Sequence, residues 1–326
     1  MNNFLHRRAF IQLAALAGTG LLGAAQAQSE RLIKLLVPVP AGGGMDACAR
    51  LLAQHCKEAL GTIVVDNRPG GALRIAIEAV KRAKADGETL LFTPVSPFTI
   101  YPHIYKKLSY DVRTDFVPVS PFCRFDFALG VPGNSPVNTL AEYVVAVKKN
   151  PEQFGMYAVP AAGSAAHFVG VQFARVAGIQ TKHIPYKGSA PAMTDLIGGH
   201  IPAAVNVTGE FVQYVADKKV KVLAITGAKR SALLPQVPTF AESGFKDLEL
   251  AEWFGLFAPA KTPASVVNTV NSAVAQALGK PEVIARLTAL GYAPFHLPAT
   301  QLMERVESEA RVWEPIVKST GFTLDE

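Results

Sequence analysis

The sequence predicts an α/β fold with two lobes, each a mostly parallel sheet flanked by helices. The first observation is an alternation of short apolar strand patterns with amphipathic helix patterns, which is typical of parallel sheets covered on both faces. The second is that this alternation begins again after Pro132. The third is a glycine loop between a strand and a helix in each half of the chain. Two α/β units of similar design therefore follow one another.

The first half has three strand patterns and two helix patterns. Apolar positions between residues 48 and 60 recur at helical spacing and stop at Gly61, and a Pro/Gly turn at 67–71 separates the second strand from the second helix. The predicted strands are Arg31–Val37, Thr62–Val65 and Thr89–Thr93, and the predicted helices are Asp46–Leu60 and Ile75–Lys84.

The second half repeats this order before the pattern changes in the last quarter. The predicted strands are Gly155–Ala158, Lys182–Ile184, Ala203–Val207 and Val220–Thr226, and the predicted helices are Thr139–Lys149, Ala165–Val176, Pro191–Ile197 and Glu210–Ala216. After Phe257, long helices are indicated at Ala264–Leu278, Glu282–Leu290 and Ala299–Ser319. We expect these last helices to return and cover the first lobe.

Residues 1–27 have the pattern of an export signal. Arg7 and Arg8 precede an apolar run that ends in the small-residue site Ala25-Gln26-Ala27. The run is too short and too rich in Ala and Gly to span a bilayer, which needs roughly 20 strongly apolar residues. We expect cleavage after Ala27 and a periplasmic mature protein. The arginine pair resembles the twin-arginine export pattern, and an ordinary secretory signal is the alternative.

Charge and cysteine usage exclude several classes. The formal net charge of +6 becomes +4 when Arg7 and Arg8 leave with the signal, and the basic pairs are scattered, so we expect no nucleic-acid partner. Cys48 and Cys56 are about 12 Å apart along one helix axis, too far for a disulfide. A bridge from either to Cys123 and three buried thiols both remain open, and no Cys/His spacing indicates zinc.

The two glycine loops are candidate anion sites. One runs from Pro40 to Gly44 and the other from Pro160 to Ser164, and each opens onto a helix N-terminus. Glycine lets the backbone approach a ligand, successive N–H groups form a concave nest, and a helix N-terminus carries about half a positive charge. A carboxylate can thus be held without arginine. In open α/β sheets such loops lie at the ligand crevice.

Some enzyme signatures in the sequence compete with this interpretation. Gly42-x-Gly44-x-x-Ala47, with Asp66 about 20 residues later, fits a dinucleotide fingerprint, but four residues separate the strand from its first glycine. Gly163-Ser164 lacks the spacing of a nucleophile elbow. His167 could activate Ser164, although hydrogen bonding within the loop explains it better. We therefore expect no catalytic residues and no cofactor, with a secreted nucleotide-dependent α/β enzyme as the alternative.

Several longer motifs resemble the Bug-type periplasmic receptors of tripartite tricarboxylate transporters, and the resemblance covers nearly everything after Gln28. The motifs are Pro40-Ala41-Gly42-Gly43-Gly44-Met45-Asp46, Asn67-Arg68-Pro69-Gly70, Ala85-Asp86-Gly87-Glu88-Thr89, Gly163-Ser164-Ala165-Ala166-His167, Ile184-Pro185-Tyr186-Lys187-Gly188, Asp195-Leu196-Ile197-Gly198-Gly199 and Pro238-Thr239-Phe240-Ala241-Glu242. Each is short, but their order and spacing are specific.

The resemblance implies a two-lobed periplasmic binding protein, type II-like, whose lobes are joined by crossing strands and close on a carboxylate. On this basis lobe 1 comprises residues 28–127 and 254–326, and lobe 2 comprises 128–253. A membrane permease is the implied partner, the receptor is expected to be a monomer, and a signalling partner is an alternative to transport. The expected ligand contacts are Gly42, Gly43, Gly44, Met45, Asp46, Ser96, Ala161, Ala162, Gly163, Ser164, His167, Tyr186, Asp195 and Thr208.

The chain departs from the family pattern at two places. Leu73-Arg74-Ile75-Ala76 replaces a usual Gly-Asn-Ile-Gly run, which puts Arg74 either at the pocket mouth as a second anchor or on a solvated helix. Val159 and Ala161 replace a common Ser and Gly beside the second loop. Because a hydroxyl is lost from the pocket wall, we expect a less polar or aromatic acid rather than citrate.

Overall fold

The computed structural model describes residues 32–324, which belong to one compact unit. The export signal expected over residues 1–27 lies outside the described residues. Within the described part of the chain, no helix is both long enough and apolar enough to cross a membrane.

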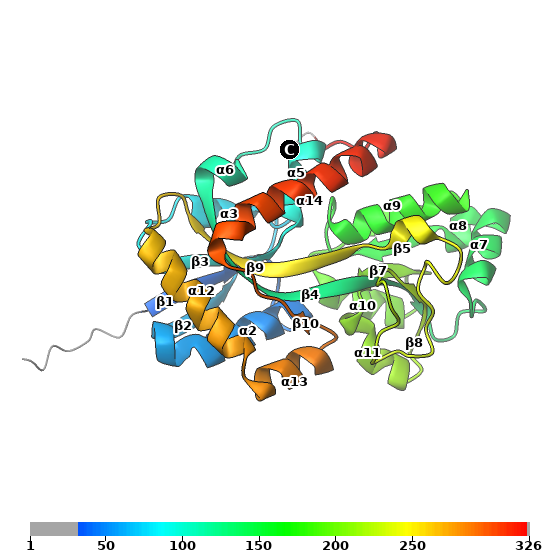
Figure 1. Ribbon diagram of the computed structural model, residues 1–326. Coiled ribbons are helices and arrows are strands. Elements are labelled where there is room, and N and C mark those ends of the chain that lie inside the picture. The colour runs from blue at the N-terminus through cyan, green and yellow to red at the C-terminus, as the bar shows by residue number, and fades with distance from the viewer. Residues whose placement is uncertain (1–31, 325–326) are drawn as a thin grey trace, which may run out of the picture. The chain divides into compact units, whose positions relative to one another are not determined.

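Three parallel strands form the sheet of the first lobe (Figure 1). Strand β1 (Leu32–Val37) pairs with both β2 (Thr62–Asn67) and β3 (Thr89–Pro94). Helices α2 (Gly44–Leu60) and α3 (Arg74–Lys81) make the crossovers that parallel neighbours require. Helix α2 begins two residues earlier than the sequence indicated, because Gly43 serves as its N-cap and Gly44 is already helical.

Two long antiparallel strands carry the chain between the lobes. Strand β4 (Phe116–Pro132) pairs with β9 (Ala251–Pro259) as far as Asp126 and with strands of the second lobe from Phe127 onward. Strand β9 also pairs with β3, so both long strands extend the sheet of the first lobe. The expected crossing strands and the two-lobed α/β fold are thus confirmed, whereas the exact lobe boundaries stay a prediction.

The second lobe repeats the parallel arrangement. Strand β5 (Met156–Val159) pairs with β6 (Lys182–Pro185) and β7 (Ala204–Val207), and β8 (Val220–Ile225) runs antiparallel to β4. Its helices are α7 (Leu140–Lys149), α8 (Pro151–Phe154), α9 (Ala165–Ala177), α10 (Ser189–Ile197) and α11 (Gly209–Ala216).

The C-terminal helices pack back on the first lobe. Helix α12 (Ala264–Leu278) lies on α2 and β4, and α14 (Ala299–Thr320) lies on β4 and also reaches α9 of the second lobe (Figure 1). The remaining elements are α4 (Ser96–Thr99), α5 (Tyr101–Ile104), α6 (Val112–Asp115), the 3-10 helix Lys246–Leu248, α13 (Pro281–Ala289) and β10 (Ala293–Pro294), which pairs with β4.

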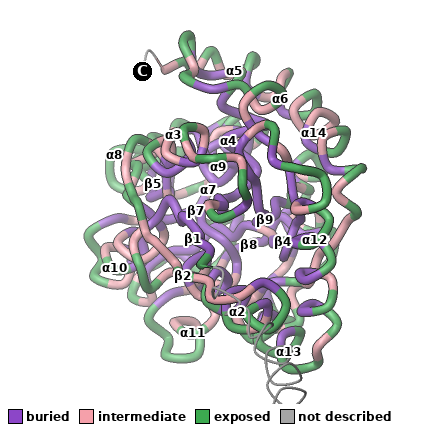
Figure 2. The backbone as a smooth tube through the Cα atoms, turned by 90° about the vertical axis from the view of Figure 1, so that its left-hand side faces the viewer, coloured by how far each residue is buried: buried purple, intermediate pink, exposed green. Residues whose placement is uncertain are grey.

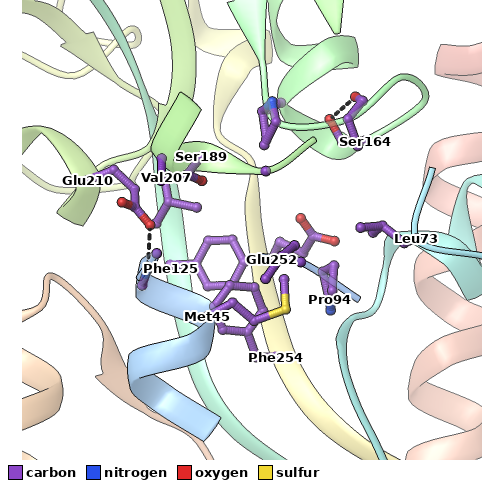
Figure 3. A pocket seen from close by; sticks show the side chains of 18 of the residues that line it. Met45, Leu73, Pro94, Phe125, Ser164, Ser189, Val207, Glu210, Glu252 and Phe254 are labelled. Carbon is purple, nitrogen blue, oxygen red and sulfur yellow. Dashed lines mark hydrogen bonds between the residues drawn. The ribbon is translucent and has the colours of Figure 1, made fainter. Parts of the chain in front are cut away.

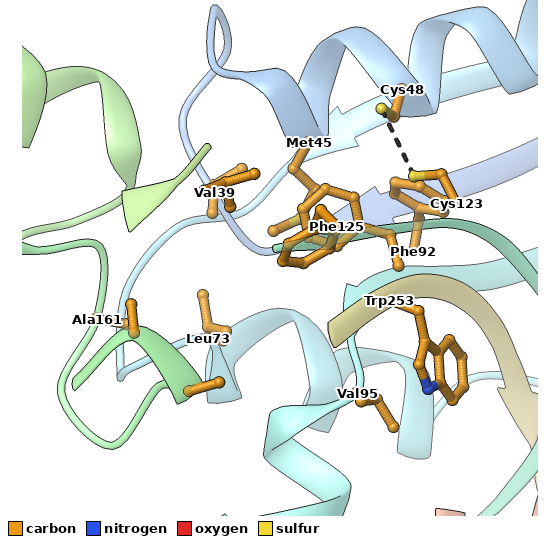
Figure 4. Close-up of a cluster of buried hydrophobic side chains, with 14 of the residues drawn as sticks. Val39, Met45, Cys48, Leu73, Phe92, Val95, Cys123, Phe125, Ala161 and Trp253 are labelled. Carbon is orange, nitrogen blue, oxygen red and sulfur yellow. Dashed lines mark hydrogen bonds between the residues drawn. The ribbon is translucent and has the colours of Figure 1, made fainter. Parts of the chain in front are cut away.

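Strands β4, β7 and β9 are almost wholly buried at the centre of the molecule (Figure 2). Beneath the first loop, aromatic rings pack in tilted or edge-to-face pairs, including Phe125 with Phe254 at 4.3 Å between centroids. The three cysteines are buried and free. The Sγ atoms of Cys48 and Cys123 lie 3.9 Å apart (Figure 4). The thiol of Cys56 faces the carbonyl of Ala273 instead.

Candidate functional site

A cavity lies between the loops of the two lobes (Figure 3). Its volume is about 60 Å³, well above the roughly 10–15 Å³ that a single water molecule needs. Its walls are mainly apolar. They comprise Val39, Pro40, Gly43, Gly44, Met45, Leu73, Pro94, Ser96, Phe125, Phe127, Pro160, Ala161, Ser164, Ala166, Gly188, Ser189, Ala190, Pro191, Val207, Glu210, Glu252 and Phe254.

The first glycine loop is held by an acid from its own helix. The carboxylate of Asp46 accepts from the backbone N–H of Gly42 at 3.1 Å, from Arg50 Nε at 2.9 Å and from Asn67 Nδ2 at 3.0 Å. Burial opposes ionisation of Asp46, but these hydrogen bonds outweigh it and hold its pKa below the usual value. The Asp46 side chain therefore shapes the loop and is not directed at the cavity.

A second acid reaches the same loop from the other lobe. Glu210, in the first turn of α11, accepts a hydrogen bond at its Oε1 from the backbone N–H of Gly44 at 2.8 Å (Figure 3). That N–H belongs to the first turn of α2, where helical N–H groups lack partners and attract negative charge. The Glu210 carboxyl group therefore already binds the Gly44 N–H, which is one of the donors of the predicted anion site.

The second glycine loop is held by neutral groups. Ser164 caps α9, because its Oγ accepts from the N–H of His167 at 3.3 Å and donates to the carbonyl of Ala161 at 2.8 Å. The N–H of Gly163 donates to Nδ1 of His167 at 3.3 Å. Gly163 has a φ of +72°, which glycine adopts without the strain that other residues incur.

His167 holds the second glycine loop through its hydrogen bonds with Gly163 and Ser164. It is 1% exposed, and its ring packs against His183 at 3.7 Å between centroids. Burial and the neighbouring His183 lower the pKa of His167 to about 3. Ser164 Oγ donates to the carbonyl of Ala161, and Nδ1 of His167 accepts from Gly163, so neither group is directed at the other as a nucleophile and its base would be.

Apolar side chains make the floor and one wall of the cavity. Met45, Phe125 and Phe254 gather at the floor, and Leu73 faces them from the N-cap of α3 (Figure 3). Leu73 has a φ of +73°, a left-handed conformation that costs a side-chain-bearing residue roughly 1–2 kcal/mol. A glycine would adopt this backbone conformation without strain. The leucine therefore places an apolar side chain in the cavity wall at a cost in backbone strain.

The expected ligand contacts divide into two groups. Those that line the cavity are Gly43, Gly44, Met45, Ser96, Ala161 and Ser164. Those that lie outside its walls are Gly42, Asp46, Ala162, Gly163, His167, Tyr186, Asp195 and Thr208. Within the second group, the loop residues act on the cavity by holding the backbone of the residues that line it.

Tyr186, Asp195 and Thr208 are engaged with the protein itself. Tyr186 Oη donates to Asp195 Oδ2 at 2.6 Å, and burial together with Asp195 raises the pKa of Tyr186 to about 12. Thr208 Oγ1 donates to the carbonyl of Asp126 at 3.1 Å, next to the crossing point of β4. The structure brings the first two together as a pair and places the third apart from them.

Sequence reasoning missed two acids of the cavity. Glu252 lies on β9 and its Oε1 accepts from the N–H of Ser96 at 2.8 Å, and Glu210 lies opposite on α11. Glu210 stood at the expected start of a helix, where acids are common for reasons of helix stability. Glu252 stood in a buried stretch of large apolar residues, and that unusual placement was the available signal.

Two other candidates lie on the surface. Arg74 packs its guanidinium over the Tyr105 ring at 4.5 Å and donates to the carbonyl of Gly71, so the structure places it outside the cavity. Asp66, the acid of the dinucleotide fingerprint, forms an ion pair with Arg68 at 2.7 Å. Among the described residues, no group of three or more His, Cys, Asp or Glu could hold a metal ion.

Comparisons with known proteins agree on one family. Residues 48–322 match the profile of the tripartite tricarboxylate transporter family receptor. BugT of Bordetella pertussis is 31% identical over 312 residues, which cover 95% of each chain.

Two solved structures share the fold over almost their whole length. The periplasmic binding protein BugD superposes with a TM-score of 0.85 at 32% identity, covering 90% of this chain and 99% of BugD. Rpa4515 of R. palustris, solved with adipate, superposes with a TM-score of 0.86 at 31% identity, covering 91% of this chain and 99% of Rpa4515.

Proposed function

Since the chain belongs to the tripartite tricarboxylate transporter family of receptors, we propose that it captures a small organic carboxylate between its lobes in the periplasm. It would then deliver this ligand to a membrane permease of the tripartite tricarboxylate type. The adipate in Rpa4515 supports a carboxylate as the ligand class. The proposal is binding without chemistry, by a protein that works as a monomer.

The observation that carries the proposal is the convergence of helix N-termini on an apolar cavity. Residues at the starts of α2, α9 and α10 line it, and neither α2 nor α10 has a side-chain cap. The first four N–H groups of a helix lack partners within the helix and favour negative charge. A carboxylate would be held by these backbone donors, with no Lys or Arg among the lining residues.

The proposed contacts follow from this arrangement. The loops Gly42 to Asp46 and Ala161 to Ser164 would grip the carboxylate through backbone groups, with Ser96 at the floor, and His167 would fix the second loop. Tyr186, Asp195 and Thr208 lie outside the cavity walls, so we propose that they contact ligand through bridging waters at the variable end of the pocket.

We propose that the lobes, residues 28–127 with 254–326 and residues 128–253, close by a hinge at the crossing point. The change of β4 partners at Phe127 supports this boundary. Thr226 supports the hinge, because its N–H donates to the carbonyl of Phe127, its Oγ1 accepts from Phe127 N–H, and its carbonyl accepts from Leu250 N–H. One residue thus ties together both segments that cross between the lobes.

A thermal-shift screen of the mature protein, from Gln28 onward, tests the proposal. The panel contains mono-, di- and tricarboxylates, aromatic acids and nicotinamide nucleotides. A ligand at about 100 times its Kd should stabilise the protein by roughly 2.7 kcal/mol. We expect a shift with one carboxylate class that is stronger for less polar or aromatic acids than for citrate. Shifts with nucleotides alone would favour an enzyme instead.

Matched glycine variants link the shift to the site. Gly163→Val lies in the second loop, and Gly178→Val lies at the far end of α9 with a similar φ of +61° and no side-chain neighbour within 4 Å. Both variants add comparable backbone strain, and Gly163→Val also crowds the Ile104 side chain, which lies 2.3 Å from an added Cβ. We expect the first to lose the ligand-induced shift and the second to keep it, and equal loss in both would contradict the assigned site.

The proposed periplasmic location rests on residues 1–27 and is tested separately. N-terminal sequencing of protein recovered from the periplasm should begin at Gln28. Replacement of Arg7 and Arg8 by lysines should retain the precursor in the cytoplasm if export uses the twin-arginine route, whereas export by the general secretory route would continue.

A further inference from the structure

Two carboxyl groups face the cavity from opposite sides. Glu252 rises from β9 at the floor and is 6% exposed, and Glu210 projects from α11 (Figure 3). Each accepts one backbone hydrogen bond at 2.8 Å, from Ser96 and Gly44 respectively. Both are therefore fixed in place at the cavity and not free to turn away into solvent.

Neither carboxyl group has a counter-charge from the protein. No Lys, Arg or His is among the residues that line the cavity, and neither glutamate takes part in an ion pair within residues 32–324. Buried carboxylates are normally paired, because loss of hydration costs free energy that only a cation or several hydrogen bonds offset. A ligand with a positive charge would supply the counter-charge that the cavity walls lack.

The groups that surround these two acids disfavour their ionised forms, so a cation would be needed to stabilise the carboxylates. Glu252 faces Glu309 of α14 and the Tyr101 hydroxyl of α5, and burial together with Glu309 raises the pKa of Glu252 to about 7. Glu210 faces Tyr292 and the Cys48 thiol, and burial raises its pKa as well, against the hydrogen bond from Gly44. No cation acts directly on either acid, whereas Arg74 acts on the neighbouring Tyr101 and Arg286 on the neighbouring Cys48.

A second polar group, the Ser96 hydroxyl, lies beside Glu252 at the floor. The Oγ atom of Ser96 is buried, its residue lines the cavity at 1% exposure, and its hydroxyl lies against Glu252, whose ionised form it favours. A buried hydroxyl normally has a hydrogen-bond partner. Next to Glu252, Ser96 Oγ offers an acceptor for a ligand N–H group.

We propose that the ligand carries a protonated amine as well as its carboxylate, with the amine between Glu252 and Glu210. This inference rests on the proposed function, in which the helix N-termini hold the carboxylate. The rings of Phe125, Phe127 and Phe254 line the space between, so the body of the ligand is apolar, and ring faces also attract cations. A plain diacid would instead bring a second negative charge to two uncompensated acids.

Calorimetric titration of the mature protein at pH 8 with ligands of one length tests the inference. Hexanoate, 6-aminohexanoate and adipate share a six-carbon chain and end in a methyl, an ammonium and a carboxylate group. Norleucine with hexanoate, and phenylalanine with 3-phenylpropanoate, place the amine next to the acid instead. In at least one pair, we expect the amino acid to bind at least 10-fold more tightly than its deaminated partner and than adipate.

The outcomes separate this inference from the proposed function. Tighter binding of the deaminated acids or adipate in every pair overturns the amine site and leaves the carboxylate receptor standing. If no carboxylate binds, with or without an amine, both proposals fail.

Isosteric variants assign the effect to the two acids. Glu252→Gln and Glu210→Gln should each weaken binding of the amino acid at least 10-fold while the deaminated acid binds equally or better. Glu309→Gln is the matched control, because Glu309 adjoins Glu252 but binds Trp253 and does not line the cavity. Unchanged discrimination in both Glu252→Gln and Glu210→Gln would overturn the inference.

The pH dependence gives a readout that a purely structural role would not produce. Since Glu252 ionises near pH 7, affinity for the amino acid should rise between pH 6 and 8, and affinity for the deaminated acid should fall. Glu252→Gln should remove both trends. A rise in affinity for both ligands as the pH falls would indicate a protonated Glu252 that donates to a carboxylate, and would overturn the amine site.

Discussion

The two glycine loops are held in place by different kinds of side chain, charged in the first loop and neutral in the second. In the first loop, charged groups hold the backbone, since Asp46 binds Gly42 and Glu210 of the other lobe binds Gly44. In the second loop, the neutral side chains of Ser164 and His167 bind backbone groups of the same turn. Both loops begin helices that line one cavity.

This difference bears on where an external anion can bind. The N-terminus of α2 already has two protein carboxylates within hydrogen-bonding distance of its loop, which offset its positive end. The N-termini of α9 and α10 have no acidic residue in their first turns. A ligand carboxylate should therefore be attracted more strongly to the second lobe, and its opposite end to the first.

The largest expected contrast comes from alanine at the two glycines of positive φ. At Gly163 an added Cβ would lie 2.3 Å from Ile104 Cδ1, whereas at Gly42 nothing lies within 4 Å. Backbone strain should cost about 1–3 kcal/mol at either position. Overpacking should add about 1–3 kcal/mol to Gly163→Ala alone. Urea denaturation measures both, and equal losses would mean that Ile104 moves aside freely.

The second contrast is one of pH and concerns His167. Its pKa is lowered from about 6.5 to about 3 in the folded state, so the neutral form is favoured. As the pH falls below 6.5, His167 is protonated in the unfolded chain but stays neutral in the folded protein. The free energy of unfolding should therefore decline by up to about 1.4 kcal/mol per pH unit until pH 3. At pH 5 this amounts to about 2 kcal/mol.

His167→Asn isolates that contribution, because asparagine presents an acceptor oxygen to Gly163 but does not titrate. The unfolding free energy of the variant should fall less between pH 7 and pH 5 than that of the parent protein. A parallel decline in both proteins would assign the pH dependence to other groups.

The third contrast concerns the acid that holds the first loop. Asp46→Ala should cost about 1–1.5 kcal/mol, because Gly42 and Arg50 can recover part of their hydrogen bonding from water. The pKa of Asp46 is lowered in the folded state, so its contribution is present above the unfolded pKa and is lost as the pH falls through the folded value. Equal costs of Asp46→Ala at pH 7 and pH 2.5 would contradict this role.

The sequence predicted the elements whose patterns are local. Alternation identified the strands and helices around each loop to within a few residues, and the glycines at 42 and 163 marked positions that do adopt positive φ. Strand β4 was not recognised from its residues, because Pro118 and Pro121 argue against a strand interior. The structure accommodates both prolines where the register with β9 shifts.

The sequence predicted the parts of the site that backbone loops form. It did not predict the side chains that reach the cavity from distant parts of the chain. Six of the expected contacts line the cavity, all of them on or beside the strand-to-helix turns. Glu210 comes within reach of Gly44 only because the chain folds across 166 residues. No local pattern encodes such a contact, and the same holds for Glu252 beside Ser96, which is separated from it by 156 residues.

The smallest expected contrast comes from the caps of the two helices. Helix α9 has Ser164 as its N-cap with a side-chain hydrogen bond, whereas α2 has Gly43 with none. Ser164→Ala should therefore cost about 1 kcal/mol, and Gly43→Ser should gain only a few tenths, because glycine is itself a tolerable N-cap. The extended φ of −88° at Gly43 and the empty space around it allow the added side chain. Chemical denaturation of both variants measures the difference, and a loss of stability in Gly43→Ser would mean that the new hydroxyl disturbs the contact between Glu210 and Gly44.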